Sequence, residues 1–275
     1  MRRIVKDFLK RTAKRFNLGI TTSSHLDELE ELNRAYCSLG SVLGFTGARA
    51  VELLEPLRAS KSQLRQDVFV LSELGLKREG FFVEFGATDG VYLSNTHLLE
   101  KEFGWRGILA EPARCWHRAL TNNRSCAIET ACVWRESGAT LEFNEVDEKE
   151  LSTVNCHSSS DLHAHSRERG KTYEVKTISL KDLLDKHKAP EVIDYLSIDT
   201  EGSEYEILSN FDFGRYRFRI ITCEHNFAPQ REQIFSLLTQ QGFVRKFEQY
   251  SLFDDWYVMT DSIYGKTRVT VSCLA

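Results

Sequence analysis

The sequence has few prolines, no strong charge of either sign and no long apolar run. None of its apolar stretches approaches the roughly 18–20 residues that a helix needs to cross a bilayer. The net charge of −4 leaves no basic footprint for nucleic acid. With 4 prolines in 275 residues and no Pro/Gly/Ser-rich linker, we expect one large α/β domain, although two smaller domains would also fit this length.

Paired cysteines are missing as well. The 7 cysteines are scattered, their number is odd, and none forms a Cys-x-x-Cys pair. Several of them lie in apolar, strand-like runs, where a free thiol behaves as a small hydrophobic group. This usage predicts a cytoplasmic protein in a reducing environment, without a disulfide framework.

The first 18 residues differ from the rest of the chain. They hold seven lysines or arginines and one acid, Asp7, and apolar residues recur among them at helical spacing. No apolar core long enough for a secretory signal is present. The pattern predicts a basic amphipathic helix, which either adheres to an anionic membrane from its inner face or packs as a solvated helix on its own domain. We expect a helical N-terminal extension over residues 1–60 and the main domain over 61–275.

From residue 62 onward, short apolar segments alternate with helical patterns. Alternation of this kind is typical of a mostly parallel sheet with helices on both faces. Strands are expected at 81–85, 107–110, 126–134, 193–198 and 218–223, with a closing pair at 243–250 and 256–259. Helices are expected at 66–74, 95–103, 112–120, 179–187, 203–209 and 230–241.

The middle of the sequence interrupts this alternation. Extended segments at 139–145 and 173–177 flank a polar stretch, 152–170, that holds three histidines. We expect an inserted loop there, and long loops in compact domains are usually functional or disordered. Cys156 and the histidines fit no standard zinc spacing, so a solvated or substrate-covering loop is favoured over a zinc site.

The first two expected strands end in residues that suit a bound ligand, because ligands of such sheets lie at the carboxyl ends of the strands. Gly86 and Gly90 flank a tight turn, and glycines there let the backbone approach a ligand closely. The turn lacks the Gly-x-Gly-x-x-Gly of a nicotinamide-dependent oxidoreductase. Glu111 ends the second strand, 21 residues after Gly90. Its carboxylate can accept two ribose hydroxyls or cap the next helix, and the strand–turn–helix context favours the ribose.

Two later strands also end in polar residues. Asp199 and Glu201 follow the strand at 193–198, and Glu224, His225 and Asn226 follow the strand at 218–223. Adjacent strands bring such residues to one rim, where they are costly unless they are solvated, paired or bound to a metal. A network of helix caps is the alternative, but polar clusters at strand ends usually bind ligands.

These stretches resemble the FkbM-type methyltransferases, a branch of the Rossmann-like S-adenosylmethionine-dependent enzymes. The resemblance covers about residues 62–260 and implies a seven-stranded, mostly parallel sheet that ends in an antiparallel hairpin. Residues 1–60 lie outside it. The matching segments are Ser62-Gln63, Gln66-Asp67, Gly80 to Gly90, Ser94-Asn95-Thr96, Leu99-Glu100, Gly104 to Gly107, Glu111-Pro112, Asp199-x-Glu201-Gly202 and Glu224-His225-Asn226.

The resemblance implies S-adenosylmethionine as the cofactor. This molecule has no phosphate, but it needs room for a methionine tail and an acid near its ammonium group, which Glu84 and Asp89 could supply. The predicted cofactor residues are Glu84, Gly86, Ala87, Asp89, Gly90, Asn95, Glu111 and Asp199.

The resemblance also implies methyl transfer to a hydroxyl oxygen, mainly of sugars and other hydroxylated metabolites. The alternative is a protein that has kept the fold, lost catalysis and serves as a membrane-associated binding or trafficking partner. The strand-end acids are all present, and this favours the enzyme. Acceptor contacts are expected from Glu201, His225, Tyr250 and Trp256, the last two as rings that stack on a sugar.

Two mechanisms remain open. A sugar hydroxyl is a poor nucleophile at neutral pH, so it must lose its proton to a base or under the influence of a metal ion. By analogy with catechol-type O-methyltransferases, Asp199, Glu224 and Asn226 would hold Mg²⁺ or Mn²⁺. In the competing mechanism, His225 is the general base, and Asp199 or Glu224 orients it.

Overall fold

The protein is described by a computed structural model that covers residues 44, 49–157, 164–168 and 170–260. The chain divides into two units, Met1–Gly44 and Phe45–Ala275. The predicted basic helix at residues 1–18 lies outside the described residues. Helix α3, Leu54–Ala59, falls in the second unit. Among the described residues, no helix has the length and apolar character to cross a membrane.

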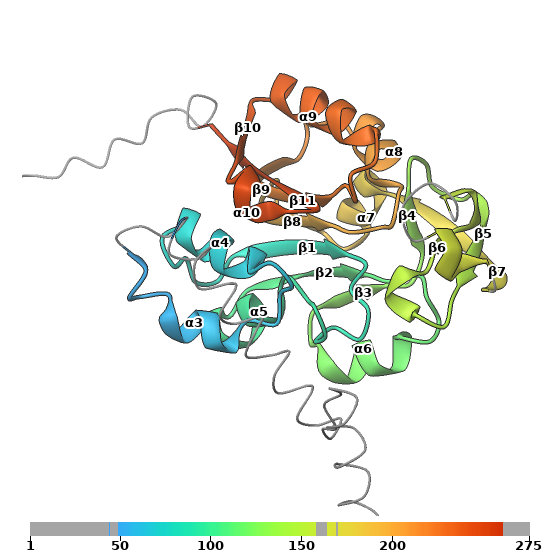
Figure 1. The fold of residues 1–275 in the computed structure, drawn as a ribbon, viewed down its shortest axis with the longest axis horizontal. Coiled ribbons are helices and arrows are strands. Elements are labelled where there is room, and N and C mark those ends of the chain that lie inside the picture. Colours follow the sequence, from blue (N-terminus) through green and yellow to red (C-terminus); the bar gives the residue numbers. More distant parts are fainter. Residues whose placement is uncertain (1–43, 45–48, 158–163, 169, 261–275) are drawn as a thin grey trace, which may run out of the picture. The chain divides into compact units, whose positions relative to one another are not determined.

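A seven-stranded sheet forms the centre of the second unit (Figure 1). The spatial order of its strands is β10-β11-β9-β8-β1-β2-β3. Among these strands, β11 is antiparallel to both neighbours and every other pairing is parallel, so the predicted sheet and closing hairpin are confirmed. The strands are β1 Phe81–Phe85, β2 Arg106–Ala110, β3 Ala127–Glu129, β8 Val192–Ile198, β9 Arg217–Glu224, β10 Phe243–Lys246 and β11 Asp254–Met259.

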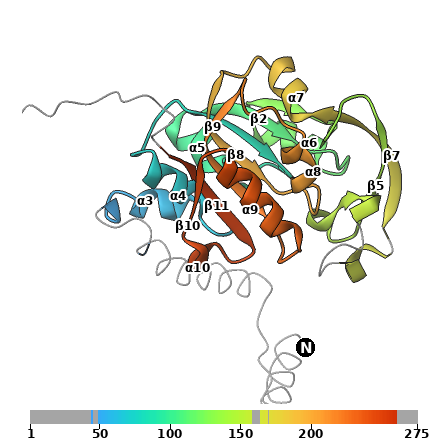
Figure 2. The same cartoon turned by 90° about the horizontal axis from the view of Figure 1, so that it is seen from above.

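Helices cover both faces of this sheet, as the alternation predicts. Figure 1 shows α8 and α9 on one side of the sheet and α5 and α6 on the other, and Figure 2 gives the view from above. Side chains of α7, α8 and α9 pack with Val83 and Phe85 of β1 in the main apolar core. On the opposite face, Phe69 of α4 stacks on Trp256. The helices are α4 Gln66–Glu73, α5 His97–Phe103, α6 His117–Asn123, α7 Leu180–Lys186, α8 Glu204–Ser209, α9 Gln230–Gln240 and α10 Glu248–Ser251.

A second sheet of four strands was not predicted. Its spatial order is β4-β7-β5-β6, and its strands are β4 Cys132–Trp134, β5 Thr140–Glu145, β6 Thr153–Val154 and β7 Lys171–Ser179. The single strand expected at 126–134 is in fact two strands in different sheets. Glu129 accepts the backbone N–H groups of Thr130 and Ala131 through its side chain, and this local turn breaks the run.

The expected loop at 152–170 contains more structure than predicted. It begins with β6 and continues through two short 3₁₀ turns, Asn155–His157 and Ala164–Arg167. A third turn, Lys149–Leu151, precedes it. Residues 158–163 and 169 lie outside the described residues.

Two predicted boundaries differ from the structure. The helix expected to start at Pro112 starts at His117. Residues 111–113 have no regular structure, and residues 114–116 form a turn that leads into the helix. The strand expected over 243–250 ends at Lys246. Phe247 adopts a left-handed backbone with φ 58°, which ends the strand and leads into α10.

A buried carboxyl on α4 predicts a pH-dependent stability. Burial raises the pKa of Asp67 to about 7 from its ordinary 3.8. The folded state keeps this proton where the unfolded chain has released it, so the free energy of unfolding falls as the pH rises between these values. Asp67→Asn mimics the protonated form and is expected to stabilise the protein by about 4 kcal/mol at pH 8, but hardly at pH 4.

Thermal unfolding of the two proteins at both pH values measures this difference. Asp182→Asn is the matched control, because hydrogen bonds from Ser137 and Ser179 lower the pKa of the exposed Asp182. This control is expected to lose stability at pH 8, the opposite direction. Equal effects of Asp67→Asn at pH 4 and pH 8 would show that the Asp67 carboxyl does not titrate as described.

Candidate active site

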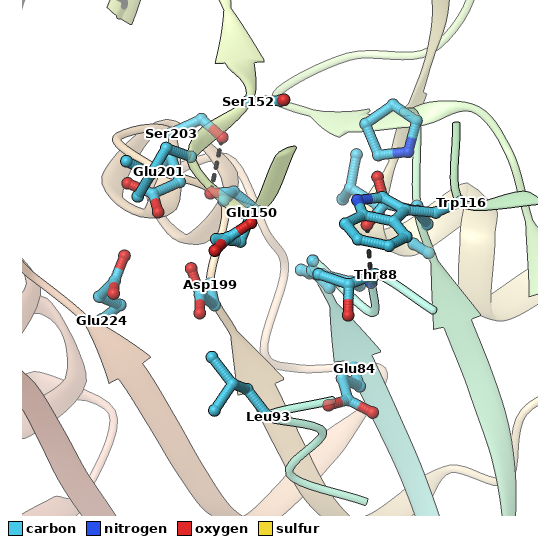
Figure 3. Close-up of a pocket in the computed structure, with 18 of the residues that line it drawn as sticks. Glu84, Thr88, Leu93, Trp116, Glu150, Ser152, Asp199, Glu201, Ser203 and Glu224 are labelled. Carbon is cyan, nitrogen blue, oxygen red and sulfur yellow. Dashed lines mark hydrogen bonds between the residues drawn. The ribbon is translucent and has the colours of Figure 1, made fainter. Parts of the chain in front are cut away.

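A cavity of about 290 Å³ lies at the carboxyl ends of β1, β2, β8 and β9. This size is at the lower end of the roughly 300–1,000 Å³ of small-molecule sites. The main sheet contributes the acids after its strands, and Figure 3 shows several of them around the same space. The smaller sheet and the segment before β6 close the other side with Cys132, Val133, Phe143, Val154 and residues 149–152.

Gly86 brings the ends of β1 and β8 into contact. Its φ is 72°, and a Cβ atom added there would lie 2.0 Å from the carbonyl oxygen of Asp199. No side chain fits such a separation, and the left-handed backbone further favours glycine. The tight turn read from the sequence therefore has a definite cause, which is the approach of two backbones.

Gly86→Ala is expected to lower the free energy of unfolding by more than about 3 kcal/mol, since the clash adds to the backbone strain. The matched control is Gly138→Ala. Gly138 also has a positive φ, 83°, but an added Cβ would meet nothing within 4 Å. The control should cost only about 1 kcal/mol, from the backbone conformation alone. Urea denaturation of both variants measures the difference, and equal costs would disprove the clash.

Glu84 is the buried anchor of this turn. Its carboxylate accepts hydrogen bonds from the backbone N–H of Asn95 at 2.7 Å and from the hydroxyl of Ser94 at 3.1 Å. The guanidinium of Arg124 lies 3.8 Å away. Burial raises the pKa of Glu84, and the charge of Arg124 opposes this shift. Glu84 lines the cavity, but these partners already use much of its hydrogen-bonding capacity.

Three predicted cofactor residues shape the turn and do not line the cavity. The Asp89 carboxylate accepts the backbone N–H groups of Val91 and Tyr92, both at 2.8 Å. The carbonyl of Gly90 accepts from Arg124, and Ala87 is buried. The predicted cofactor residues that do line the cavity are Glu84, Gly86, Asn95, Glu111 and Asp199.

Glu111 holds both carboxylate oxygens in fixed positions. One accepts the backbone N–H of Thr88 at 2.8 Å, and the other accepts that of Ala113 at 2.7 Å. Burial raises the pKa of Glu111 to about 7. A carboxylate oxygen has two lone pairs, so each oxygen can still accept a ribose hydroxyl. Glu111 thus ties the β1 turn to the β2 turn and offers the paired acceptors that a nucleoside needs.

Asp199 and Glu224 form a carboxyl pair at the ends of neighbouring strands. Figure 3 shows both side chains pointing into the same space, with Glu201 beyond them. Oxygen atoms of these three carboxylates lie within 4.8 Å of one another. Burial raises the pKa of Asp199 to about 6, and burial together with the nearby Asp199 raises that of Glu224 well above its ordinary range. Two such carboxyls favour sharing one proton.

Glu201 is tied to the insertion by Arg167. The guanidinium of Arg167 lies 2.7 Å from the Glu201 carboxylate, and its side chain is fully buried. Asn226 also donates its amide to Glu201, at 3.4 Å. The hydroxyl of Thr153 donates to the carbonyl of Glu201 at 3.0 Å. The segment after β8 and the insertion are therefore joined beside the carboxyl pair.

The surroundings of His225 do not favour its predicted role as a base. It does not line the Asp199 cavity, but borders a second cavity of about 220 Å³ with Gly202 and Arg231. Its Nδ1 accepts the backbone N–H of Phe227 at 3.0 Å. The neutral ring therefore carries its proton on Nε2, which faces Asp255 at 3.7 Å. No lone pair is left to accept a proton from an acceptor.

The predicted sugar contacts near the last hairpin are corrected in the same way. Trp256 is 0% exposed and stacks on Phe69 with ring centroids 4.6 Å apart, so it cannot stack on a sugar. Tyr250 packs near Phe247 and does not line the cavity.

Several cavity residues were not predicted. Trp116 and Phe143 supply apolar walls, and Lys149 lies over the Trp116 ring at 5.4 Å. Tyr92 lines the opening and is 49% exposed. Of these, only Tyr92 lies beside a recognised motif, and a conspicuous aromatic residue after the glycine turn was the signal that could have found it.

The strand order, the glycine turn after β1 and the acid after β2 define a Rossmann-like methyltransferase of the S-adenosylmethionine-dependent class. The sequence profile described as the methyltransferase FkbM domain matches residues 84–257, which is more than half of the chain. The protein belongs to this family and is a methyltransferase. No curated protein matches the sequence.

Solved structures show distant similarity. The FkbM methyltransferase of Methylobacillus flagellatus KT is 11% identical, with a TM-score of 0.42, and the match covers 83% of this chain and 60% of that one. The precorrin-6y C5,15-methyltransferase of Geobacter metallireducens GS-15 is 12% identical, with coverages of 70% and 85% and a TM-score of 0.37. A SAM-dependent methyltransferase of Aquifex aeolicus is 12% identical, with coverages of 81% and 98% and a TM-score of 0.33. None of these similarities bears on the acceptor.

The family implies S-adenosylmethionine as the cofactor, and the cavity residues fit it. Glu111 presents two carboxylate oxygens at the end of β2, where a ribose can bind. Gly86 lines the same cavity beside the end of β1. The lining is rich in carboxylates, which suits a sulfonium cation.

Proposed function

We propose that the protein transfers a methyl group from S-adenosylmethionine to a hydroxyl oxygen of a sugar or a related hydroxylated metabolite. The observation that supports this most is the half-buried Asp199–Glu224 pair in the same cavity as Glu111. Methyl transfer to a hydroxyl needs a proton acceptor, because the neutral oxygen is a weak nucleophile, whereas a neutral amine is nucleophilic enough without one. When bound, the cofactor supplies an electrophilic methyl group for in-line displacement.

In this proposal the chain's residues position the reactants and move one proton. Glu111 accepts the ribose hydroxyls, while Gly86 lets the ends of β1 and β8 meet at the edge of the cavity. The Asp199–Glu224 pair accepts the acceptor's hydroxyl proton. Burial raises the pKa of Asp199, so its carboxylate is more basic than an exposed one. Burial excludes water and holds the groups in a fixed geometry.

A divalent cation is the second candidate for activating the hydroxyl. Asp199, Glu201 and Glu224 offer oxygen ligands suited to Mg²⁺ or Mn²⁺. The third ligand beside the pair would then be Glu201, whereas the sequence predicts Asn226. Arg167 already pairs with Glu201 at 2.7 Å and would repel a second cation there. We therefore favour proton transfer to the carboxyl pair. Activity that survives exhaustive EDTA treatment would eliminate the metal.

The proposed function is tested by incubating the protein with methyl-labelled S-adenosylmethionine and a panel of saccharides. The expected result is label in a saccharide, with equimolar S-adenosylhomocysteine. Thermal unfolding with S-adenosylhomocysteine serves as a binding control, because a ligand of the native state must raise its stability. Binding without transfer to any hydroxyl would contradict the O-methyl acceptor and leave the methyltransferase class intact.

A further inference from the structure

The side chains that line the cavity are strongly unbalanced in charge. Among the described residues, the lining contains six carboxylates and one lysine, Lys149. Two of the carboxylates have buried arginine partners, Glu84 with Arg124 and Glu201 with Arg167. The remaining four have one lysine among them. These four are Glu111, Glu150, Asp199 and Glu224.

This imbalance persists when the reactants are considered. The bound sulfonium cofactor carries one net positive charge, which offsets one of the four carboxylates. Burial raises the pKa of Glu111 to about 7, which lowers the negative charge of a second without removing it. Lys149 compensates another, but it lies over the Trp116 ring at the wall of the cavity. A second anion close to the carboxyl pair would meet repulsion in a partly desolvated space. A phosphate or carboxylate on the acceptor is therefore disfavoured.

The opening of the cavity offers apolar and amide groups instead. Tyr92 lines the opening and is 49% exposed, and its backbone is fixed by the Asp89 carboxylate at 2.8 Å. Asn226 and Gln63 add side-chain amides to the lining. An exposed aromatic ring packs against the C–H face of a sugar, and amides bind its hydroxyls. This combination recognises an uncharged polyol.

We propose that the acceptor is a saccharide without phosphate or carboxylate groups, which packs on Tyr92 and is selected by the carboxylates that line the cavity. Sugar phosphates, nucleoside-diphosphate sugars and uronic acids are excluded by charge. Glu150 is the residue of this set that lies on the turn before β6 and is exposed. This inference rests on the proposed function and specifies its substrate class.

Pairs of acceptors that differ only in charge test the inference. Methyl glycosides and the corresponding methyl glycosiduronates are compared by kcat/KM for labelled methyl transfer by the full chain. The neutral member of each pair is expected to be at least tenfold better. Equal values, or a preference for the uronate, would overturn the inference. Transfer to neither class, with binding of S-adenosylhomocysteine retained, would overturn the sugar acceptor of the proposed function and this inference with it.

Charge reversal at the cavity edge supplies a matched pair of variants. Glu150→Lys is expected to raise the ratio of kcat/KM for the uronate to kcat/KM for the neutral glycoside severalfold. Glu148→Lys is the control, because Glu148 is also exposed on the same segment but does not line the cavity. The same change in both variants would indicate a general charge effect and contradict the role of the cavity lining.

A third variant tests the aromatic contact. Tyr92→Ala is expected to raise KM for the neutral glycoside at least fivefold with little change in the affinity for S-adenosylhomocysteine. Val244→Ala, at another exposed apolar residue in β10, is expected to change neither value. An unchanged KM in Tyr92→Ala would remove Tyr92 from the acceptor site.

Discussion

Asp199→Asn and Glu224→Gln are each expected to reduce kcat by at least about 10²-fold, the lower end of the contribution of general acid–base catalysis. The amides keep the size of the side chains but cannot accept the hydroxyl proton. Asp199 and Glu224 lie within 4.8 Å of each other, so removing either one also removes the shared-proton arrangement. Single-turnover methyl transfer measures this effect without interference from product release.

The control for these variants is Asp212→Asn, in an exposed turn where the carboxylate accepts the backbone N–H of Gly214. It is expected to leave kcat unchanged. The affinity for S-adenosylhomocysteine should stay within a few fold in Glu224→Gln, which separates chemistry from cofactor binding. Normal kcat in both active-site variants would show that the pair is not the proton acceptor.

Glu111→Gln is expected to weaken binding of S-adenosylhomocysteine by about 10²-fold, or about 2.7 kcal/mol. The amide loses one acceptor and places an N–H₂ group against the backbone N–H of Thr88 or Ala113, which the carboxylate now accepts. Buried polar groups left without partners carry a large cost. Isothermal titration calorimetry measures the affinity, and thermal unfolding of the ligand-free variant measures the cost to the fold.

These two measurements separate the roles of Glu111. If it only joins the two turns, the variant unfolds at a lower temperature but its remaining folded fraction binds the ligand normally. If it also binds the ribose, the affinity falls beyond any change in stability. Glu136→Gln is the control, since Glu136 is an exposed acid away from the cavity.

The sheet and the strand-end acids could be predicted because they are local in the sequence. The apolar segments of the main sheet are buried on both faces, which gives them a clear pattern, and each acid directly follows its strand. Gly86 was recognisable for the same reason, since a turn from strand to helix needs its backbone freedom. The cofactor half of the site therefore follows from short motifs.

Alternation along β9 would have corrected the prediction for His225. Successive residues of a strand point to opposite faces, so Glu224 and His225 could not both face the cavity. Thr222 and Glu224 lie on one side, whereas Cys223 packs in the main apolar core on the other. The same alternation along β11 puts Trp256 among the buried residues that face α4.

The insertion side of the cavity had no comparable signal. Arg167 and Glu201 are 34 residues apart, and their contact depends on how β5, β6 and β7 pair. Phe143 is an ordinary alternating strand residue, and Trp116 is an ordinary aromatic residue near a helix start. Such long-range contacts are set by tertiary packing, which no local pattern in a single sequence records.

The most direct test of the central claim is the chemical identity of the methylated product. Labelled S-adenosylmethionine, the protein and a neutral glycoside are incubated, and the product is examined by NMR. The account predicts one new methyl ether on the saccharide, formed by the native protein and at least about 10²-fold more slowly by Asp199→Asn. A methyl group on nitrogen or carbon, or equal rates for the two proteins, would contradict it.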